Sequence, residues 1–281
     1  MDNNLKEFIL TTLKEAFDSI NPAMTNYSEF SESLSKEVQV KEGNNIQYNF
    51  DLMLDGLIKE NLSKFGVTGN IFSEESGFFN NGEEKYRVVY DPFCNSSLAS
   101  KTFLDAAVGI SIFSYDYEFI TSAIMDYQTG IIAIVEDEKT KLYQIQNRKE
   151  LKFERDPKEN IEDSWVVITI ENQEERKGLS RSMEILEKAK RIIIGSGHIY
   201  WLRLVTGVID VYTDPFRGEP LYEMFASTVA QKSGCIVTNV DGEAFDPSEC
   251  LKIFEKNKDF VFCPVGTSNE ILHKKIIASL K

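Results

Sequence analysis

The feature that most constrains the fold is a series of short apolar runs between residues 105 and 146. The runs are Ala107–Phe113, Ile120–Met125, Ile131–Val135 and Leu142–Gln146. Turn-forming segments separate them, as expected for consecutive antiparallel strands. Apolar residues at helical spacing precede these runs and predict amphipathic helices over residues 2–20 and 50–64. The first half of the chain is therefore predicted to be α+β.

The second half of the chain alternates between predicted strands and predicted helices. Strands are predicted over residues 165–170, 191–194, 208–212, 235–239 and 260–263. Helices are predicted over residues 176–190, 198–206, 221–233 and 267–280. This alternation is typical of an α/β arrangement with a mixed or mostly parallel sheet. A charged stretch over residues 147–163 is interpreted as a surface linker, so we expect two halves, residues 1–150 and 151–281.

Composition limits the class of protein. At 281 residues, with 42% hydrophobic and 27% charged residues, the chain can bury the core of an ordinary globular protein. Its formal net charge of −14 argues against nucleic-acid or membrane partners, because both require a positively charged surface. No apolar run approaches the roughly 20 residues of a membrane helix, and the N-terminus is too polar for a secretory signal. We expect a cytoplasmic protein whose four cysteines are reduced.

Candidate functional residues begin where the apolar run Val88-Val-Tyr90 meets Asp91 and Pro92. Pro92 has no backbone N–H group, so a strand is expected to stop at Asp91. The segment Asn95-Ser-Ser97 contains common helix-capping residues and predicts a helix start. A carboxylate at a strand end, facing the free N–H groups of a helix, suits a metal ion and a phosphate. The same residues also fit an ordinary strand-to-helix turn with a capping aspartate.

Other candidate residues have ordinary structural explanations as well. Glu74 and Glu75 are adjacent in a predicted loop, where glutamates are most often solvated. Asp51 lies near the start of a predicted helix, where a carboxylate suits the helix dipole. The chain has only two histidines, His198 and His273, so a histidine-rich metal site is excluded.

Three stretches together resemble the inositol monophosphatase family, part of the fructose-1,6-bisphosphatase-like sugar phosphatases. That family carries Gly-Glu-Glu, then Asp-Pro-x-Asp-Gly-Thr, then Trp-Asp-x-Ala-Ala-Gly. In the same order and spacing, this chain has Ser73-Glu-Glu75, Asp91-Pro-Phe-Cys-Asn-Ser96 and Tyr222-Glu-Met-Phe-Ala-Ser227. The resemblance covers nearly the whole chain. It implies a layered αβαβα sandwich of the sugar phosphatase type, with its site between the two halves.

The resemblance also implies an activity and a metal site. Family members hydrolyse sugar or polyol phosphates with two or three Mg²⁺ ions, which activate water and stabilise the leaving oxygen. The metal ligands would be Glu74, Asp91 and Glu223, with Cys94 in the place of a bridging aspartate. Ser96 replaces a threonine that orients the attacking water, and Asp51 matches an acid near the metals. Because family members are often dimers, a homodimer is one option.

The resemblance also implies which residues contact the substrate. The backbone around Asn95 and Ser96 would hold the phosphate. Gly195-Ser196 matches a family turn that touches the polyol, although it also fits a plain strand-to-helix turn. The resemblance further implies that the substrate contacts Asp214, Arg217 and Glu223. The guanidinium of Arg217 could reach a second phosphate or carboxylate, or it could be a solvated loop residue.

Cys94 is the departure from the family pattern with the largest chemical consequence. A thiol is a soft, poor ligand for Mg²⁺, so at least one metal site should be weakened and any Mg²⁺ should bind weakly. Asn95 also replaces a glycine that lets backbone approach the phosphate closely. No histidine is placed by motif to activate Cys94 as a nucleophile, so we interpret it as a small filler in a former metal site.

Three interpretations of the function remain open. The first is an atypical Mg²⁺-dependent phosphomonoesterase. The second is a pseudophosphatase that binds a phosphorylated sugar or a protein partner. The third is an enzyme of another reaction class on the same fold, because fold alone does not fix function.

Overall fold

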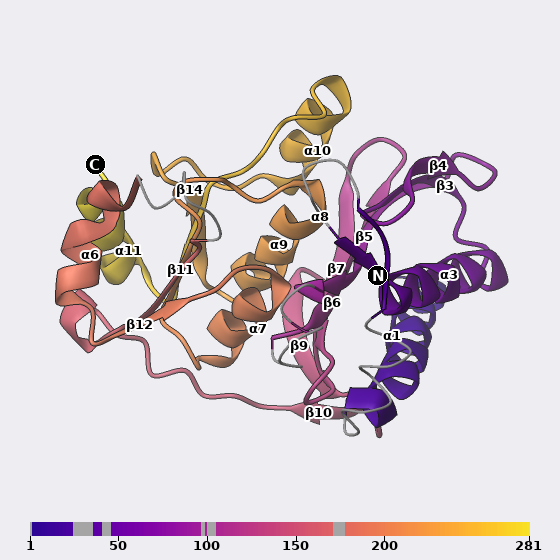
Figure 1. Ribbon diagram of the computed structural model, residues 1–281, viewed down its shortest axis with the longest axis horizontal. Coiled ribbons are helices and arrows are strands. Elements are labelled where there is room, and N and C mark those ends of the chain that lie inside the picture. The colour runs from indigo at the N-terminus through magenta and orange to yellow at the C-terminus, as the bar shows by residue number, and fades with distance from the viewer. Residues whose placement is uncertain (1, 25–35, 41–45, 97–98, 100–104, 171–177) are drawn as a thin grey trace.

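The computed structural model describes the chain except residues 1, 25–35, 41–45, 97–98, 100–104 and 171–177, and its elements lie in layers (Figure 1). The first layer is a pair of helices, α1 (Asn3–Met24) and α3 (Asn49–Lys64). Apolar residues at helical spacing, among them Phe8 and Leu54, are fully buried against one face of a large sheet. The predicted helices over 2–20 and 50–64 are therefore confirmed.

The large sheet has eight strands in the order β10-β9-β8-β7-β6-β5-β3-β4. Their bounds are β3 (Gly69–Ser73), β4 (Gly77–Asn80), β5 (Tyr86–Cys94), β6 (Ala107–Ser114), β7 (Phe119–Asp126), β8 (Ile131–Glu136), β9 (Lys139–Gln144) and β10 (Lys149–Leu151). Neighbours are antiparallel except for β3 and β5, which run parallel. The predicted meander over residues 107–146 is confirmed as β6 to β9. A separate ribbon pairs β1 (Glu37–Val40) with β2 (Ile46–Tyr48).

The second sheet has five strands in the order β12-β11-β13-β15-β14. Their bounds are β11 (Trp165–Ile168), β12 (Arg191–Ile194), β13 (Val211–Thr213), β14 (Ile236–Asn239) and β15 (Pro264–Thr267). Strand β11 is parallel to both neighbours, whereas β15 is antiparallel to both of its own. The sheet is therefore mixed, which is one of the two arrangements predicted.

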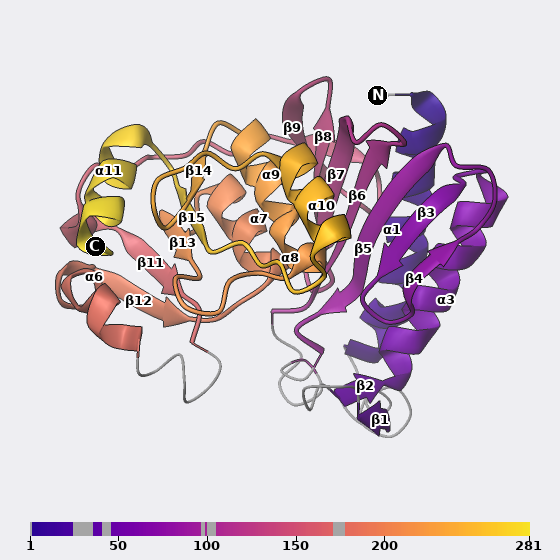
Figure 2. The ribbon, with the colours of Figure 1, turned by 90° about the horizontal axis from the view of Figure 1, so that it is seen from above.

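Helices fill the space between the sheets and cover the outer face of the second sheet (Figure 2). The middle helices are α7 (His198–Thr206), α8 (Leu221–Met224), α9 (Ala226–Lys232) and α10 (Pro247–Lys256). The outer helices are α6 (Met183–Lys188) and α11 (Glu270–Ser279), and short 3-10 helices occupy Ile161–Asp163 and Gly178–Ser182. The order of layers is thus helix, sheet, helix, sheet, helix. The αβαβα sandwich implied by the resemblance is confirmed.

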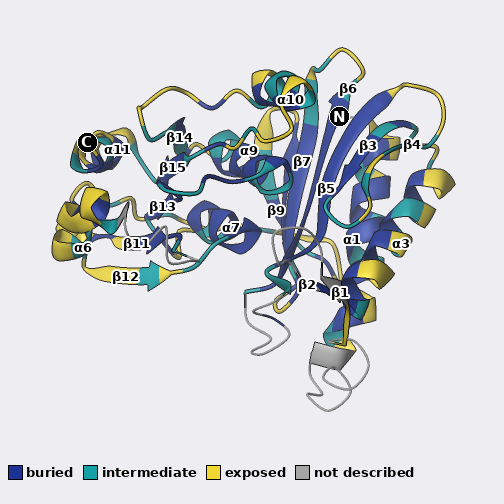
Figure 3. Ribbon diagram, turned by 45° about the horizontal axis from the view of Figure 1, so that its top comes forward, coloured by how far each residue is buried: buried dark blue, intermediate teal, exposed yellow. Residues whose placement is uncertain are grey.

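One apolar cluster joins the first sheet, the middle helices and the second sheet. It includes Val89 of β5, Trp201 of α7, Phe225 between α8 and α9, and Tyr212 of β13. Helix α7 is covered on all sides, and of its nine residues only Arg203 and Thr206 are not buried. Figure 3 shows this buried centre in dark blue, with exposed residues at the periphery. The site described below lies at the start of this buried helix.

Several predicted boundaries are wrong. Strand β5 does not stop at Asp91 but continues through Pro92 to Cys94, with a register shift against β6 between Asp91 and Cys94. Proline is tolerated there because a bulge leaves its missing N–H outside the regular ladder. The predicted strand over 260–263 is instead β15, and Phe262 forms only an isolated bridge with Glu219.

Helical predictions near the undescribed segments are tested only in part. The helix predicted from Asn95-Ser-Ser97 lies partly outside the described residues, although the N–H of Ala99 donates to the carbonyl of Asn95 at 2.9 Å. The helix predicted over 176–190 begins outside them and continues as a 3-10 turn followed by α6. The charged stretch 147–163 contributes β10 and then an extended connection between the sheets (Figure 1). The division into halves at residue 150 stays a prediction. Among the described residues, no helix combines the length and apolar character needed to cross a membrane.

Candidate functional site

The irregular end of β5 positions Asp91 and Cys94. Asp91 pairs with Gly109 of β6, and Cys94 pairs with Ala107 after the register shift. Both side chains are buried, at 2% and 3% exposure. Asn95 follows with a φ of +68°, in the left-handed region that asparagine tolerates better than most residues other than glycine. The chain can therefore turn sharply out of β5 without a glycine at this position.

Asp91 is in contact with Glu74 and within electrostatic reach of Glu223, two acids from distant segments of the chain. The backbone N–H of Glu74 donates to the carbonyl of Tyr90 at 3.1 Å, which places Glu74 beside β5. The Glu74 side chain hydrogen-bonds the Asp91 carboxyl. Burial, reinforced by the negative charges of Glu74 and Glu223, raises the pKa of Asp91 well above its ordinary value. Carboxyls this close require a shared proton or a cation. Of the three predicted metal ligands, Glu74 and Asp91 are thus in direct contact, and Glu223 acts on Asp91 through its charge.

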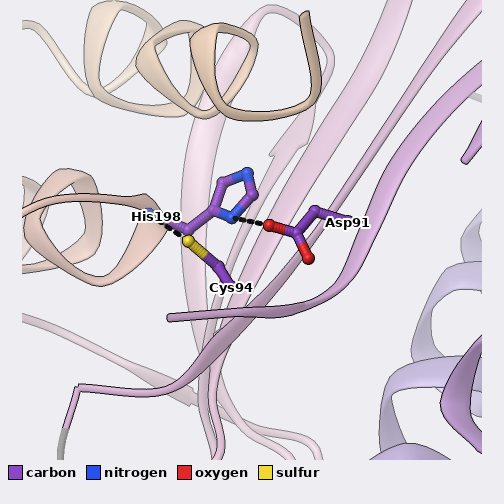
Figure 4. A group of neighbouring side chains, drawn as sticks. All are labelled: Asp91, Cys94 and His198. Carbon is purple, nitrogen blue, oxygen red and sulfur yellow. Dashed lines mark hydrogen bonds and ion pairs between the residues drawn. The ribbon is translucent and has the colours of Figure 1, made fainter. Parts of the chain in front are cut away.

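His198, the first residue of α7, also belongs to this cluster. Its Nε2 lies 2.9 Å from the carbonyl oxygen of Tyr222, and its Nδ1 lies 3.5 Å from Oδ2 of Asp91 (Figure 4). Burial lowers the pKa of His198 to about 4, so the ring is neutral at pH 7. Because a carbonyl only accepts, Nε2 carries the proton and Nδ1 presents its lone pair to Asp91.

Sequence reasoning did not assign His198 to the site. The residue follows Gly195-Ser196-Gly197, and that turn was the only available signal. No sequence spacing relates the turn to Asp91, because the two come together only when the middle helices pack on the first sheet.

Two glycines make room for this arrangement. A Cβ atom on Gly109 would lie 2.5 Å from Nε2 of His198, which is closer than any normal contact. A Cβ on Gly197 would collide with the sulfur of Cys94, and Gly197 also has a φ of +88°. The backbone N–H of His198 can therefore donate to Cys94 Sγ at 3.4 Å.

The Cys94 thiol is poorly suited to act as a nucleophile. Burial raises its pKa well above the ordinary value, and the negative charges of Asp91 and Glu223 add to this effect. The hydrogen bond from His198 opposes the shift but does not reverse it. Without a cation beside it, Cys94 is a neutral thiol at pH 7, and thiolate rather than thiol is the reactive form. The interpretation of Cys94 as a filler stays a prediction.

Arg217 lies between two of the predicted substrate-binding acids. Its Nη2 is 3.2 Å from Oε2 of Glu223, and its Nε is 3.9 Å from Oδ2 of Asp214. Asp214 is almost fully buried and also accepts hydrogen bonds from the backbone N–H groups of Arg217 and Gly218, at 3.2 and 3.1 Å. Asp214 therefore shapes the loop, and Arg217 is directed toward Glu223 rather than left as a solvated loop residue.

Asn95 and Ser196 connect the two sheets across the site. The Asn95 Nδ2 donates to the carbonyls of Ser196 and Asp105, at 2.8 and 3.0 Å. The Ser196 hydroxyl donates to Oδ1 of Asn95 at 3.3 Å. Gly195 precedes this contact, and a Cβ there would collide with the hydroxyl of Tyr200. The predicted substrate residues Asn95, Gly195 and Ser196 thus come together, with Ser96 half-buried beside them.

Asp51 has a structural contact. Its Oδ2 accepts a hydrogen bond from the backbone N–H of Tyr48 at 2.8 Å, in a capping arrangement at the start of α3. The pKa of Tyr127 is raised by burial and by the charges of both Asp91 and Asp51, so Asp51 lies within electrostatic reach of the strand end. The capping explanation for Asp51 is confirmed, and its catalytic role stays a prediction.

Comparison with known proteins identifies similar folds but no close relatives. No family model matches the sequence, and no curated protein matches it in sequence. The extragenic suppressor protein SuhB of Bartonella henselae superposes with a TM-score of 0.75 at 13% identity, covering 99% of this chain and 98% of its own. An inositol monophosphatase of Thermotoga maritima gives 0.74 at 14% identity, with 98% and 95% covered.

A third similar structure is archaeal. It is a hypothetical protein of Pyrococcus horikoshii, described as similar to inositol-1 monophosphatase. Its TM-score is 0.73 at 17% identity, and the match covers 100% of both chains. At such identities, these likenesses are evidence for the fold alone.

Proposed function

We propose that this chain, which has the inositol monophosphatase fold, is a phosphomonoesterase that acts on a sugar or polyol phosphate. The observation that carries the proposal is the hydrogen-bonded pair of Glu74 and Asp91 at the end of β5, with the charge of Glu223 within electrostatic reach. Glu74 and Asp91 come from different segments, and their mutual repulsion is costly unless they share a proton or bind a cation, whereas Glu223 pairs with Arg217. A cluster of this kind supports metal-assisted hydrolysis better than a purely structural role.

A single hard cation such as Mg²⁺ fits beside Glu74 and Asp91. Their carboxyls already hydrogen-bond each other, so a cation could replace the shared proton and supply the oxygen-rich environment that Mg²⁺ prefers. When bound, it would polarise the phosphoryl group and activate a water molecule. A second Mg²⁺ next to Cys94 does not fit, because a thiol and a neutral imidazole are poor partners for a hard ion. We therefore propose one Mg²⁺ in place of the two or three that the resemblance implies.

The protein's own groups would orient the substrate. The turn at Asn95 and Ser96 follows the strand end and offers backbone N–H groups for a phosphate. Arg217 binds Glu223 now, and its guanidinium could be shared with an anionic substrate through charge-assisted hydrogen bonds. In this proposal Asp214 holds the Arg217 loop, and Glu223 competes with the substrate for the guanidinium.

A second candidate function is binding without hydrolysis, to a phosphorylated sugar or a protein partner. The burial of Asp91 and Cys94 and the ion pair between Arg217 and Glu223 favour it. In such a protein the acidic residues would be neutralised internally and would not recruit Mg²⁺. No described feature favours a different reaction class over these two.

Phosphate release from a panel of sugar and inositol phosphates tests the choice. If the protein is a phosphatase, the wild type releases phosphate only with Mg²⁺, and Glu74→Gln abolishes release. The neighbouring Glu75→Gln is a matched control, because the Glu75 carboxylate accepts a hydrogen bond from the side chain of Gln47. If only Cys94→Asp, or Cys94→Asp with Asn95→Gly, releases phosphate, the natural protein is a binding protein or an enzyme of another reaction class. No release from any variant would refute the phosphatase proposal.

A further inference from the structure

Asp91, Cys94 and His198 form a cluster whose thiol and imidazole have no part in the proposed hydrolysis. A carboxylate oxygen, the sulfur and a ring nitrogen from these residues all lie within 4.8 Å of one another. All three side chains are buried. Figure 4 shows the Asp91 carboxylate and the Cys94 sulfur beside the His198 ring, which comes from the start of α7. Among the described residues, this is the group of acid, cysteine and histidine side chains that matches a metal-ligand set.

We infer that Asp91, Cys94 and His198 bind a borderline divalent cation, with Zn²⁺ as the best match. Zn²⁺ is held in proteins by thiolate sulfur, imidazole nitrogen and carboxylate oxygen, and this cluster supplies one of each. Two anionic ligands, Asp91 and the Cys94 thiolate, would balance the charge of the ion in a buried setting.

The hydrogen bonds of His198 are those of a metal ligand. Its Nε2–H donates to the carbonyl of Tyr222 at 2.9 Å, and ligand histidines typically fix their free N–H on such an acceptor. Its Nδ1 is fully buried and has no hydrogen-bond partner among the described residues. That lone pair faces Oδ2 of Asp91 at 3.5 Å. A buried acceptor without a partner is destabilising, and a cation between the two atoms would remove the cost.

The surroundings of Cys94 suit a metal-bound thiolate. The N–H of His198 points at Sγ from the N-terminus of the nine-residue helix α7, where the helix dipole favours negative charge. Asp91 and Glu223 oppose a free thiolate, so ionisation requires the cation itself. Binding would displace the thiol proton to solvent and form a bond between sulfur and the metal. Three protein ligands leave a fourth position open, as in catalytic zinc sites.

This inference does not depend on the proposed phosphatase activity. It concerns another cation and another donor set, with Asp91 as the shared residue. Its test therefore uses metal binding and no substrate, so that failure of one proposal leaves the other intact.

The test is metal binding by the chelator-stripped full chain. Titration with Co²⁺ as a spectroscopic substitute for Zn²⁺ should give one ion per chain and a cobalt–thiolate charge-transfer band. Cys94→Ser should abolish the band, and His198→Gln should weaken binding by more than the roughly 10–100-fold typical of outer-shell changes. Cys250→Ser removes another buried thiol, in α10, and should leave both signals unchanged.

Three results would overturn the inference: no bound metal, a Co²⁺ complex without the thiolate band, or a band that survives in folded Cys94→Ser. Circular dichroism shows whether each variant is folded. X-ray absorption of the wild-type zinc complex needs no variant, and it should detect one sulfur at about 2.3 Å from the metal. A ligand shell of nitrogen and oxygen alone would refute the assignment of Cys94.

Discussion

Replacing Gly109 with alanine tests whether His198 is held as tightly as the structure indicates. The added Cβ would lie 2.5 Å from Nε2 of His198, so the ring must move. Overpacking of this kind costs about 1–3 kcal/mol, and loss of the hydrogen bond to Tyr222 adds about 1 kcal/mol. Alanine is otherwise better than glycine within a strand by roughly 0.5–1 kcal/mol. The net expectation is a loss of about 1–3 kcal/mol in the free energy of unfolding.

Urea unfolding of four variants measures this coupling in a double-mutant cycle. Gly109→Ala, His198→Ala and the double variant are compared with the wild type. Removing the ring vacates the space that the new methyl group needs, so Gly109→Ala should cost little in the His198→Ala background. Gly56→Ala in α3 is the matched control, because nothing lies within 4 Å of the added Cβ. That control should be stabilising by up to about 1 kcal/mol, since alanine favours helix.

Two outcomes would refute this reasoning. In the first, Gly109→Ala is as stable as the wild type, which would mean that the ring has room to move. In the second, its cost is the same with and without the His198 ring, which would mean that the strain lies elsewhere along β6.

Three further predictions concern residues at or away from the site. Burial lowers the pKa of His273 to about 4, below its ordinary 6.5, so between these pH values the unfolded chain binds more protons than the folded chain. Stability therefore falls as the pH drops from 6.5 to 4. His273→Gln should make the urea midpoint depend less steeply on pH in that window, and an unchanged dependence would contradict the prediction. Asn95→Gly relieves the left-handed backbone but removes the hydrogen bonds to Ser196, so the free energy of unfolding should fall by about 1–3 kcal/mol and the melting temperature with it. A higher melting temperature would show that relief of backbone strain outweighs the lost hydrogen bonds. Arg217→Gln removes the ion pair between Arg217 and Glu223, so calorimetry should show a stability loss that shrinks as salt is added, because salt screens the attraction that the wild type keeps; an equal loss at low and high salt would exclude the ion pair as its cause.

Regular elements were predictable because their patterns are local. The helices of the first layer and the strands of the meander follow from apolar spacing alone. Helix α10 was missed, although Asp246 caps it and Pro247 occupies its first turn, both of which are helix-start signals. Strand β15 contains a proline and a glycine and has weak β-propensity, so pairing with β13 and β14 determines its position. Its location was therefore not readable from the segment itself.

The candidate site was predictable only where motifs exist. The resemblance placed Glu74, Asp91 and Glu223 at one site; the structure shows Glu74 hydrogen-bonded to Asp91 and the charge of Glu223 acting on the same carboxyl, and their role as metal ligands stays a prediction. It gave no role to His198, whose position depends on the packing of α7 against β6 and on the absence of a side chain at Gly109. The protonation state of each site residue, and the direction in which its donor atoms point, depend on tertiary contacts and burial. A single sequence does not contain this information.

The hydrogen bond from His198 to Cys94 joins residues 104 positions apart in the chain. Contacts of such long range form late in folding, because the entropy of closing a large loop must be overcome before they contribute. Neither half alone can assemble the thiol–imidazole pair, since Cys94 belongs to the first sheet and His198 to the middle helices. A cation bound by both Cys94 and His198 would thus cross-link the first sheet to the middle helices. Its dissociation rate would report how often these two layers separate.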